Sequence, residues 1–179
     1  QLLEYLQDRH PKIRFFRFEN GGHGATEHVH HYFQLTYIFS GKGTVHNHPY
    51  EMPMEPNCMY MFNPHELHAL DPKHEVECIN VTCRFELNGF QGHLLRPMIR
   101  MDEHNAADCE ALLRKIQAET TVGEPENLIR ANLLLTELLL LLNILCLKEE
   151  NDKISSLVAD SIDYINNNFC SGIGVEDIA

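Results

Sequence analysis

The stretch EHVHHYFQLTYIFSGKG, residues 27–43, places three histidines just before a run of alternating residue types that ends in a glycine turn. Side chains alternate across a β-strand, so on one continuous strand every second residue lies on the same face. The residues that would share the polar face are His28, His30, Tyr32 and Gln34. Two imidazoles one residue apart, with an amide four positions on, can converge on one point inside a barrel. The stretch therefore predicts a strand with a polar binding face.

The other face of this predicted strand is apolar and consists of Phe33, Leu35, Tyr37 and Phe39. On patterning alone, an apolar face points toward the protein interior. The polar face lies inside only if it has something to bind, or if both faces of the strand are covered. Three interpretations of the histidines therefore stay open: a solvated, histidine-rich edge, a metal site, and a polar pocket without metal.

A third imidazole from a neighbouring strand would complete a three-histidine site, and His68 in the stretch NPHELHAL is the candidate. Such a site leaves positions open for water or a ligand, and a divalent ion such as Zn, Ni or Fe suits it. The predicted metal ligands are His28, His30 and His68. Imidazoles and an amide also offer donors and acceptors to hydroxyl groups without any metal. The predicted ligand pocket consists of His28, His30, Gln34, His68, Tyr37 and Arg17.

Short strands separated by Gly, Pro and Asn turn signals fill the chain from Ile13 to about Phe85. Residues 47–49, for example, predict a hairpin tip. This spacing predicts an antiparallel sandwich or barrel. The fold class that we expect is mainly β plus α, with an antiparallel β-barrel followed by a helical segment.

After Gly92 the apolar residues recur at helical spacing, which predicts helices over residues 106–120 and 126–150. The second helix is apolar on nearly every face, so it must be covered on more than one side, and one side can be a subunit interface. A third helix is expected to start at Asn151 or Asp152, either of which could cap it. The predicted division of the chain is therefore into residues 1–92, 93–150 and 151–179.

Composition narrows the classes of function. The formal net charge of −12 repels phosphate backbones, so these residues alone should bind nucleic acid poorly. The six cysteines form no C-x-x-C pair, and no secretion signal is visible, which favours reduced core thiols and a cytoplasmic location. The apolar run at residues 133–147 is too short to span a bilayer comfortably and predicts a deeply buried helix, with no membrane partner.

The spacing His28-x-His30-x(3)-Gln34-x(6)-Gly41 resembles the first cupin motif, with glutamine where that motif has glutamate. The stretch NPHELH supplies part of the second motif, including His68. With the strands that follow, residues 24–85 resemble the sensing domain of AraC/XylS-type transcription regulators. The tail DSIDYINNNFCSGIGVEDIA, residues 160–179, is similar to the opening of that family's DNA-binding domain.

The resemblance implies a bacterial transcription regulator that is not an enzyme and has no catalytic residue. Its barrel would bind a small polar effector, sugars being the family's commonest class. It would form a homodimer through helices 106–120 and 126–150, and would contact promoter DNA only through a C-terminal domain after residue 179. The alternative is a cupin-type metalloenzyme, an isomerase or dioxygenase, with a three-histidine site. Gln34 lacks the carboxylate that such an enzyme uses, although Glu27 and Glu66 are close in sequence.

Overall fold

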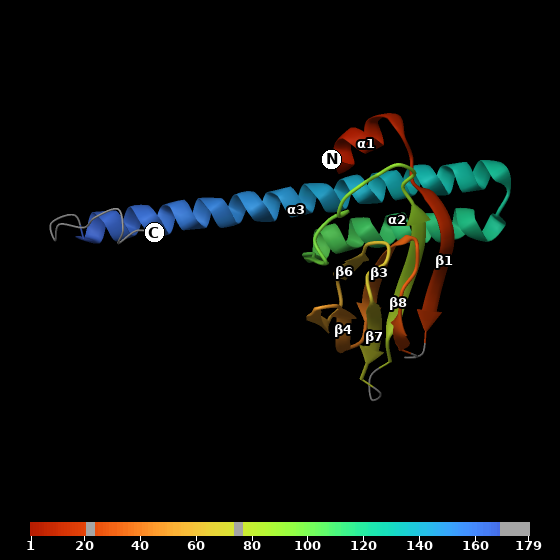
Figure 1. Ribbon diagram of the computed structural model, residues 1–179, viewed down its shortest axis with the longest axis horizontal. Helices are drawn as coiled ribbons and strands as arrows, with labels where there is room; N and C mark the ends of the chain where they lie inside the picture. Colours follow the sequence, from red (N-terminus) through yellow and green to blue (C-terminus); the bar gives the residue numbers. More distant parts are fainter. Residues whose placement is uncertain (21–23, 74–76, 169–179) are drawn as a thin grey trace. The chain divides into compact units, whose positions relative to one another are not determined.

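Residues 1–20, 24–73 and 77–168 are described in the computed structural model, and they form two antiparallel sheets and three α-helices (Figure 1). The five-stranded sheet has the order β1 (Lys12–Asn20), β8 (Ile79–Glu86), β3 (Phe33–Ser40), β6 (Cys58–Phe62) and β9 (Met98–Arg100). The four-stranded sheet has the order β2 (Ala25–His28), β7 (His68–Pro72), β4 (Gly43–Asn47) and β5 (Tyr50–Met54). The helices are α1 (Leu2–Asp8), α2 (Glu103–Val122) and α3 (Pro125–Asn168). The predicted fold class, mainly β plus α, is confirmed.

One face of the five-stranded sheet packs against the four-stranded sheet. Ile38 and Tyr60 from the first sheet join Val45 and Leu70 from the second in one buried apolar cluster. The strand register puts Gln34 and Thr36 of β3 on the same face as Ile38, beside Arg84 and Thr82 of β8. The inner face is therefore apolar toward one end and polar toward the other.

The opposite face of the five-stranded sheet is covered by helices. The phenol of Tyr37 donates a hydrogen bond to the Glu110 carboxylate of α2 at 3.0 Å, and Arg114 of α2 lies over the Phe39 ring at 5.4 Å. Further along, the backbone N–H of Ile13 in β1 donates to the Asn132 amide oxygen of α3 at 2.9 Å. Both faces of β3 are thus covered, which is the condition under which its polar face can lie inside.

Two glycines allow close approaches of the backbone at the predicted turn after β3. Gly41 has φ of +115°, a conformation that costs a side-chain-bearing residue free energy. A Cβ atom on Gly43 would lie 2.2 Å from the backbone oxygen of Asp71 in β7. The glycine turn therefore permits the close pairing of β4 with β7.

Helix α2 is confirmed where the apolar spacing predicted it, and it extends further at both ends. The Asp102 carboxylate accepts a hydrogen bond from the backbone N–H of Asn105 at 2.8 Å, which caps the first turn. Gly123 ends the helix in the left-handed conformation, with φ of 73°. The helix buries one face, formed by Ala106, Cys109, Leu112, Leu113 and Ile116.

Helix α3 begins at Pro125 as expected, but the predicted start of a third helix at Asn151 or Asp152 is wrong. The helix continues to Asn168, since no Gly or Pro interrupts residues 126–168. An ion pair between Glu149 and Lys153, 3.0 Å apart at i,i+4 spacing, spans the predicted break. Residues 169–179 of the tail that resembles the opening of a DNA-binding domain lie outside the described residues.

By its internal contacts the chain divides into two units, residues 1–143 and 144–179. The run at residues 133–147 is buried on one face only, not deeply on all sides: Leu135, Leu138, Leu139 and Leu142 are fully buried, whereas Leu133, Ile144 and Leu147 are exposed. In the described part of the chain, Pro125–Tyr164 is long and apolar enough to cross a membrane by length and composition alone, a test that core helices of soluble proteins also pass.

Candidate functional site

The continuous histidine strand that the sequence predicted is not found. Strand β2 ends at His28 in the four-stranded sheet, and β3 starts at Phe33 in the five-stranded sheet, so residues 29–32 cross from one sheet to the other. The crossing follows from pairing, because the first part of the stretch pairs with β7 and the second part with β6 and β8. His28 and Gln34 therefore approach one another from different sheets.

The predicted histidines come together despite this crossing. His28 lies directly opposite His68 in the register of β2 and β7. The ring centroids of His28 and His68 are 4.4 Å apart, and those of His30 and His68 are 4.8 Å apart. One nitrogen from each of these rings lies within 4.8 Å of the others. The Phe62 ring stacks on His68, with centroids 4.2 Å apart, and gives the cluster an apolar wall.

Hydrogen bonds fix which nitrogen of each ring carries a proton. Nδ1 of His28 donates to the backbone oxygen of Thr26 at 2.8 Å, and Nδ1 of His68 donates to that of Glu66 at 2.8 Å. Nε2 of His30 donates to the side-chain oxygen of Gln34 at 2.9 Å. Since these acceptors have no proton to give, the remaining nitrogen of each neutral ring presents a lone pair.

Two of these lone pairs have no partner among the described residues. Nδ1 of His30 and Nε2 of His68 are buried and make no hydrogen bond. Burial lowers the pKa of His30, and it lowers the pKa of His68 to about 4, with the neighbouring imidazoles and Arg84 adding to the effect. Both rings are therefore neutral at pH 7, and each offers an unsatisfied acceptor.

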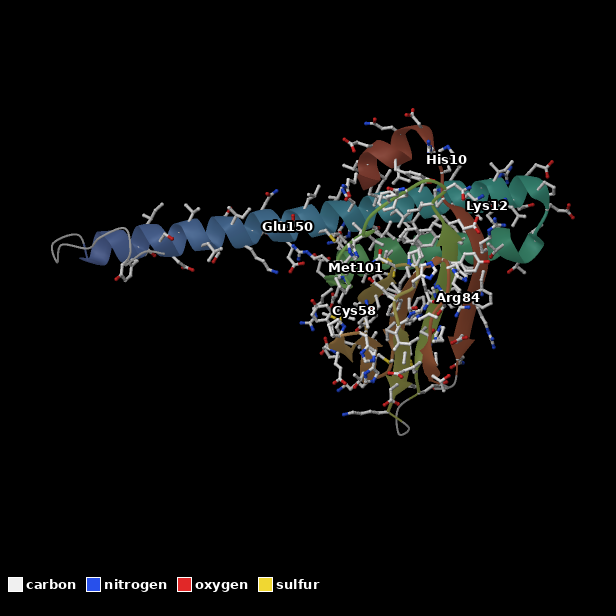
Figure 2. All side chains as sticks on the ribbon, in the orientation of Figure 1. His10, Lys12, Cys58, Arg84, Met101 and Glu150 are labelled. Carbon is white, nitrogen blue, oxygen red and sulfur yellow. The ribbon has the colours of Figure 1, made fainter. Side chains whose placement is uncertain are left out.

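Arg84 of β8 is a member of this site that the sequence analysis missed (Figure 2 labels it). Its Nε donates to the Gln34 oxygen at 2.8 Å, and its Nη2 lies 3.4 Å from Nε2 of His28. The amide of Gln34 in turn donates to the Thr36 hydroxyl at 3.3 Å. The signal was present in the stretch INVTCRF, where polar Asn80, Thr82 and Arg84 alternate with apolar residues.

The structure does not bring Tyr37 and Arg17 to the histidines. Tyr37 lies on the face of β3 that is covered by α2, where burial raises the pKa of its hydroxyl. Arg17 on β1 is mostly exposed, and its Nε lies 3.6 Å from the Glu19 carboxylate. Register places Arg17 opposite Thr82, but no contact with the cluster is found in the described part of the chain.

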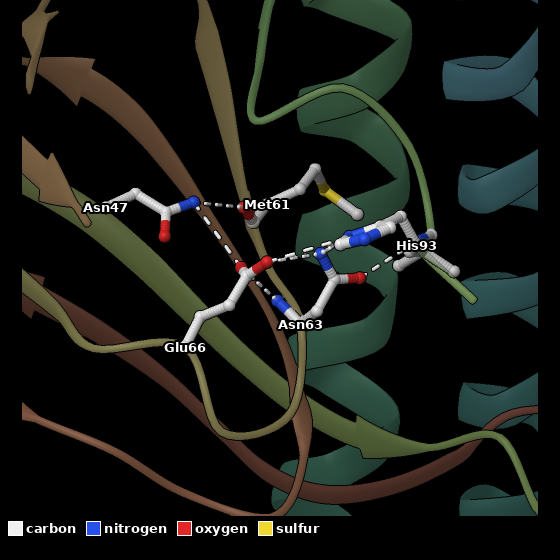
Figure 3. Close-up of polar contacts among 6 residues, drawn as sticks. Asn47, Met61, Asn63, Glu66 and His93 are labelled. Carbon is white, nitrogen blue, oxygen red and sulfur yellow. Dashed lines mark hydrogen bonds and ion pairs between the residues drawn. The ribbon is translucent and has the colours of Figure 1, made fainter. Parts of the chain in front are cut away.

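The two carboxylates near the motif are engaged elsewhere. Glu27 lies 3.0 Å from Nε2 of His48 on the exposed surface. The Glu66 carboxylate accepts hydrogen bonds from the backbone and side chain of Asn63 and lies 3.7 Å from Nδ1 of His93 (Figure 3). Glu66, Asn63 and His93 line a cavity of about 680 Å³, whose lining also includes His31 and His65. Neither carboxylate takes the place of the glutamate that the cupin motif has at the position of Gln34.

The donor set fits a divalent metal in its chemistry. Three imidazoles suit Zn, Ni or Fe, and outer hydrogen bonds to Thr26, Gln34 and Glu66 hold the rings in the way that metal-binding histidines are held. Two unsatisfied ring nitrogens also favour an occupant. The guanidinium of Arg84 opposes a second cation here, because no carboxylate in the cluster offsets its charge.

Comparisons with solved structures return cupins. A cupin protein from Bacteroides fragilis is 13% identical, with a TM-score of 0.37 over 44% of this chain and 70% of that one. An RmlC-like cupin from Shewanella frigidimarina is 14% identical, with a TM-score of 0.35 over 42% and 73%. A DMSP lyase from Ruegeria pomeroyi is 14% identical, with a TM-score of 0.33 over 42% and 39%. At these scores the likeness says nothing about function.

No match was found among curated proteins. The family described as AraC-like ligand binding domain matches residues 10–161, which include both sheets, α2 and most of α3. The match covers well over half of the chain, and it agrees with the resemblance that the histidine spacing indicated. The chain therefore belongs to the family of AraC-like ligand binding domains, the N-terminal sensing domains of AraC-family regulators.

Proposed function

We propose that this chain is the effector-sensing and dimerisation part of a bacterial AraC/XylS-like transcription regulator, and that its effector binds at the three-histidine cluster. The observation that carries the site is the pair of buried, unpartnered nitrogens on His30 and His68. A buried polar atom without a partner costs about 1–3 kcal/mol, which a bound donor would recover. A domain of this family is expected to work in a regulator rather than as an enzyme.

The effector would be a small polar metabolite that presents hydroxyl groups to the site. His28, His30 and His68 supply acceptor nitrogens, and Gln34 holds both His30 and Arg84 in place. Sugars carry such hydroxyl groups in quantity. The proposed pocket leaves out Tyr37, whose hydroxyl donates to Glu110, and Arg17, whose Nε lies 3.6 Å from the Glu19 carboxylate.

The test is thermal unfolding of the chain with a panel of sugars and other small hydroxylated metabolites. A compound of this panel that binds should raise Tm, because a ligand of the folded state stabilises the folded state by mass action. The rise should be lost in His30→Ala and in His68→Asn, and kept in the control His104→Ala, whose side chain is exposed. If a ligand keeps its effect in both cluster variants, the effector site lies elsewhere.

The homodimer would form through α2 and α3, chiefly through the face of α3 that the chain itself leaves uncovered. Ile129 is 61% exposed and Leu133 is 48% exposed, and they follow one another at i,i+4 spacing. Apolar residues on one stripe of a helix are typical of a subunit interface. Effector binding would then shift the population of dimer states and so the spacing of two DNA readers.

Promoter DNA would be contacted by a C-terminal domain that follows these residues, since the chain itself carries a net charge of −12. We place the regulator in the cytoplasm, where free thiols stay reduced; Cys58, Cys78, Cys83 and Cys109 are free thiols and buried. Specific binding of the complete regulator to promoter DNA, altered by the effector, is the measurement that tests this step.

A cupin-type metalloenzyme is the second candidate, and the three-histidine group favours it. His28, His30 and His68 would hold a divalent ion, which would act as a Lewis acid toward a bound substrate. The test is the metal content of the purified chain, with His28→Ala and His68→Ala as variants. Stoichiometric Zn, Ni or Fe in the parent, absent from both variants, together with turnover would establish the enzyme, whereas a metal-free, well-folded parent would exclude it.

A further inference from the structure

The guanidinium of Arg84 is a half-buried positive charge without a matching carboxylate. Among the described residues, Arg14 pairs with Glu86, Arg17 with Glu19 and Arg100 with Glu55, but no carboxylate forms an ion pair with Arg84. It contacts the oxygen of Gln34, Nε2 of His28 and the face of Phe15, and none of these groups is an anion. In a chain of net charge −12, an arginine that faces the interior without an anion stands out.

The geometry of the imidazoles sets the second requirement on a ligand. One nitrogen from each ring lies within 4.8 Å of the others, so a single oxygen centred among these three nitrogens would lie at most about 2.8 Å from each, which is hydrogen-bond distance. Nδ1 of His30 and Nε2 of His68 are buried acceptors without a partner, so an oxygen that contacts either of them must carry a proton. A hydroxyl group meets the requirement, and a second anionic oxygen would be repelled.

Together these features require a ligand with one anionic group beside one or more hydroxyl groups. We propose that the effector is a small hydroxy-carboxylate, whose carboxylate pairs with Arg84 and whose hydroxyl donates to Nδ1 of His30 or Nε2 of His68. This inference rests on the proposed sensing function and specifies the ligand of that same site. A planar guanidinium matches the two oxygens of a carboxylate, which gives specificity as well as affinity.

A phosphate ester fits the site less well than a carboxylate does. A phosphate group carries more than one negative charge at neutral pH and three acceptor oxygens. Arg84 is the one cationic side chain in contact with the cluster among the described residues. Nδ1 of His30 and Nε2 of His68 offer lone pairs instead of protons, because the other nitrogen of each ring donates its proton elsewhere. The surplus anionic oxygens would therefore face acceptors.

The experiment compares each acid with a neutral molecule of the same shape. The pairs are D-glucuronate with D-glucose, D-galacturonate with D-galactose, and D-gluconate with D-glucitol; L-malate, L-tartrate and inorganic phosphate complete the panel. Thermal unfolding of the chain ranks them at one ionic strength, and calorimetric titration gives Kd for those that raise Tm. We expect at least one hydroxy acid to raise Tm, and its neutral counterpart to bind at least about tenfold more weakly.

Variants of Arg84 link the effect to this residue. Arg84→Gln should weaken binding of the acid by about tenfold or more, and should weaken any binding of the neutral sugar by much less. Arg84→Lys keeps the charge but loses the planar fork, so an intermediate loss is expected. The matched control is Arg100→Gln, which removes an exposed arginine that pairs with Glu55. Near-ultraviolet circular dichroism establishes that each variant is folded.

Three results would overturn the assignment: equal binding of an acid and its neutral counterpart, full acid binding by a folded Arg84→Gln variant, or no effect of any hydroxy acid. A neutral sugar that binds in a His68-dependent manner while no acid binds would overturn the carboxylate and uphold the sensing site. Phosphate that binds as tightly as the best acid, in an Arg84-dependent manner, would also overturn the carboxylate. The wild-type comparison needs no variant, so a misfolded variant does not leave the question open.

Discussion

His68 shows how a single side chain acquires its properties from its surroundings. It is fully buried, its ring stacks on Phe62, and its Nδ1–H donates a hydrogen bond to the backbone oxygen of Glu66. These contacts hold the ring in one orientation and one tautomer, and burial keeps it neutral. The same residue on an exposed strand edge would be an ordinary surface histidine, which is why spacing alone left three interpretations open.

Tyr37 provides a residue-scale test of which face of β3 binds the effector. Tyr37→Phe removes the hydrogen bonds to Glu110 and Asn57 and should lower the free energy of unfolding by about 1–2 kcal/mol. Because Tyr37 lies on the helix-covered face, Kd for the effector should stay unchanged. Urea unfolding and calorimetric titration measure the two quantities. A large change in Kd without loss of stability would place Tyr37 in the pocket after all.

Cys109 provides a second residue-scale test, which concerns thiol chemistry and pH. Burial raises the pKa of its thiol to about 12, so the thiol stays protonated in the folded chain at neutral pH. Above the ordinary thiol pKa the unfolded state loses a proton that the folded state keeps, so stability should fall as pH rises from about 9. Urea unfolding at pH 7 and at pH 10 measures this contribution, with Cys109→Ala as the reference.

The same burial predicts slow modification of the described thiols. In a background in which Cys146 and Cys170 are both replaced by serine, a thiol reagent such as DTNB at pH 8 should react only as fast as the chain unfolds. Addition of urea should expose the four remaining thiols, those of Cys58, Cys78, Cys83 and Cys109. Rapid modification of a folded sample would show that one of these sites opens without global unfolding.

At the scale of elements, short local signals decided where helices begin and end. Asp102 caps α2, Gly123 ends it and Pro125 starts α3, each in agreement with the chemistry of helix termini. The capping potential of Asn151 and Asp152 was misleading, because these residues lie inside a helix that nothing interrupts. An N-cap residue starts a helix only where the preceding backbone has already left the helical conformation.

The cap of α2 yields a prediction at this scale. Asp102→Ala should lower the free energy of unfolding by about 1 kcal/mol, because the first-turn N–H of Asn105 loses its acceptor and the helix N-terminus loses a negative charge. Asp102→Asn retains an acceptor and should cost less. Urea unfolding of the three proteins measures the difference. Equal stability of the alanine variant and the wild type would show that water replaces the cap without cost.

At the scale of the whole molecule, α3 is the element whose burial the chain itself does not complete. One face of the helix is buried and is formed by Leu135, Leu138, Leu139 and Leu142, while the stripe with Ile129 and Leu133 is exposed. Burying a leucine fully is worth about 1.5–3 kcal/mol, so a second copy that covers this stripe would gain several such contributions. In the proposed homodimer, a second copy of the chain would cover this exposed apolar stripe.

The prediction for assembly is a loss of the dimer when a charge enters this stripe. Sedimentation equilibrium should give a dimer for the wild type and a monomer for Leu133→Glu, because a carboxylate in an apolar interface is costly to desolvate. The control Lys148→Glu changes the charge of an exposed position that is not apolar and should stay dimeric. A monomeric wild type at high concentration would rule out a stable dimer of this chain.

Much of this architecture could be read from the amino-acid order. Most strands up to Glu86, though not the division between β2 and β3, follow from period and turn chemistry, which depend on neighbours in the chain. The hairpin tip at residues 47–49 and the position of α2 follow in the same way. The convergence of His28, His30 and His68 was also predicted, although for the wrong reason. The short strand β9 was missed, because three residues give no usable period.

The arrangement of the side chains around the site could not be predicted from the sequence, because this arrangement depends on which strands pair. The crossing at residues 29–32 takes the histidines from one sheet to the other, and only pairing with β7 and then β8 reveals it. The same pairing brings Arg84, fifty residues after Gln34 in the chain, into contact with it. By itself, the sequence determined the elements and the candidate ligands, since those rest on local chemistry; the fold decided which charges and lone pairs face one another, since that rests on contacts between distant residues.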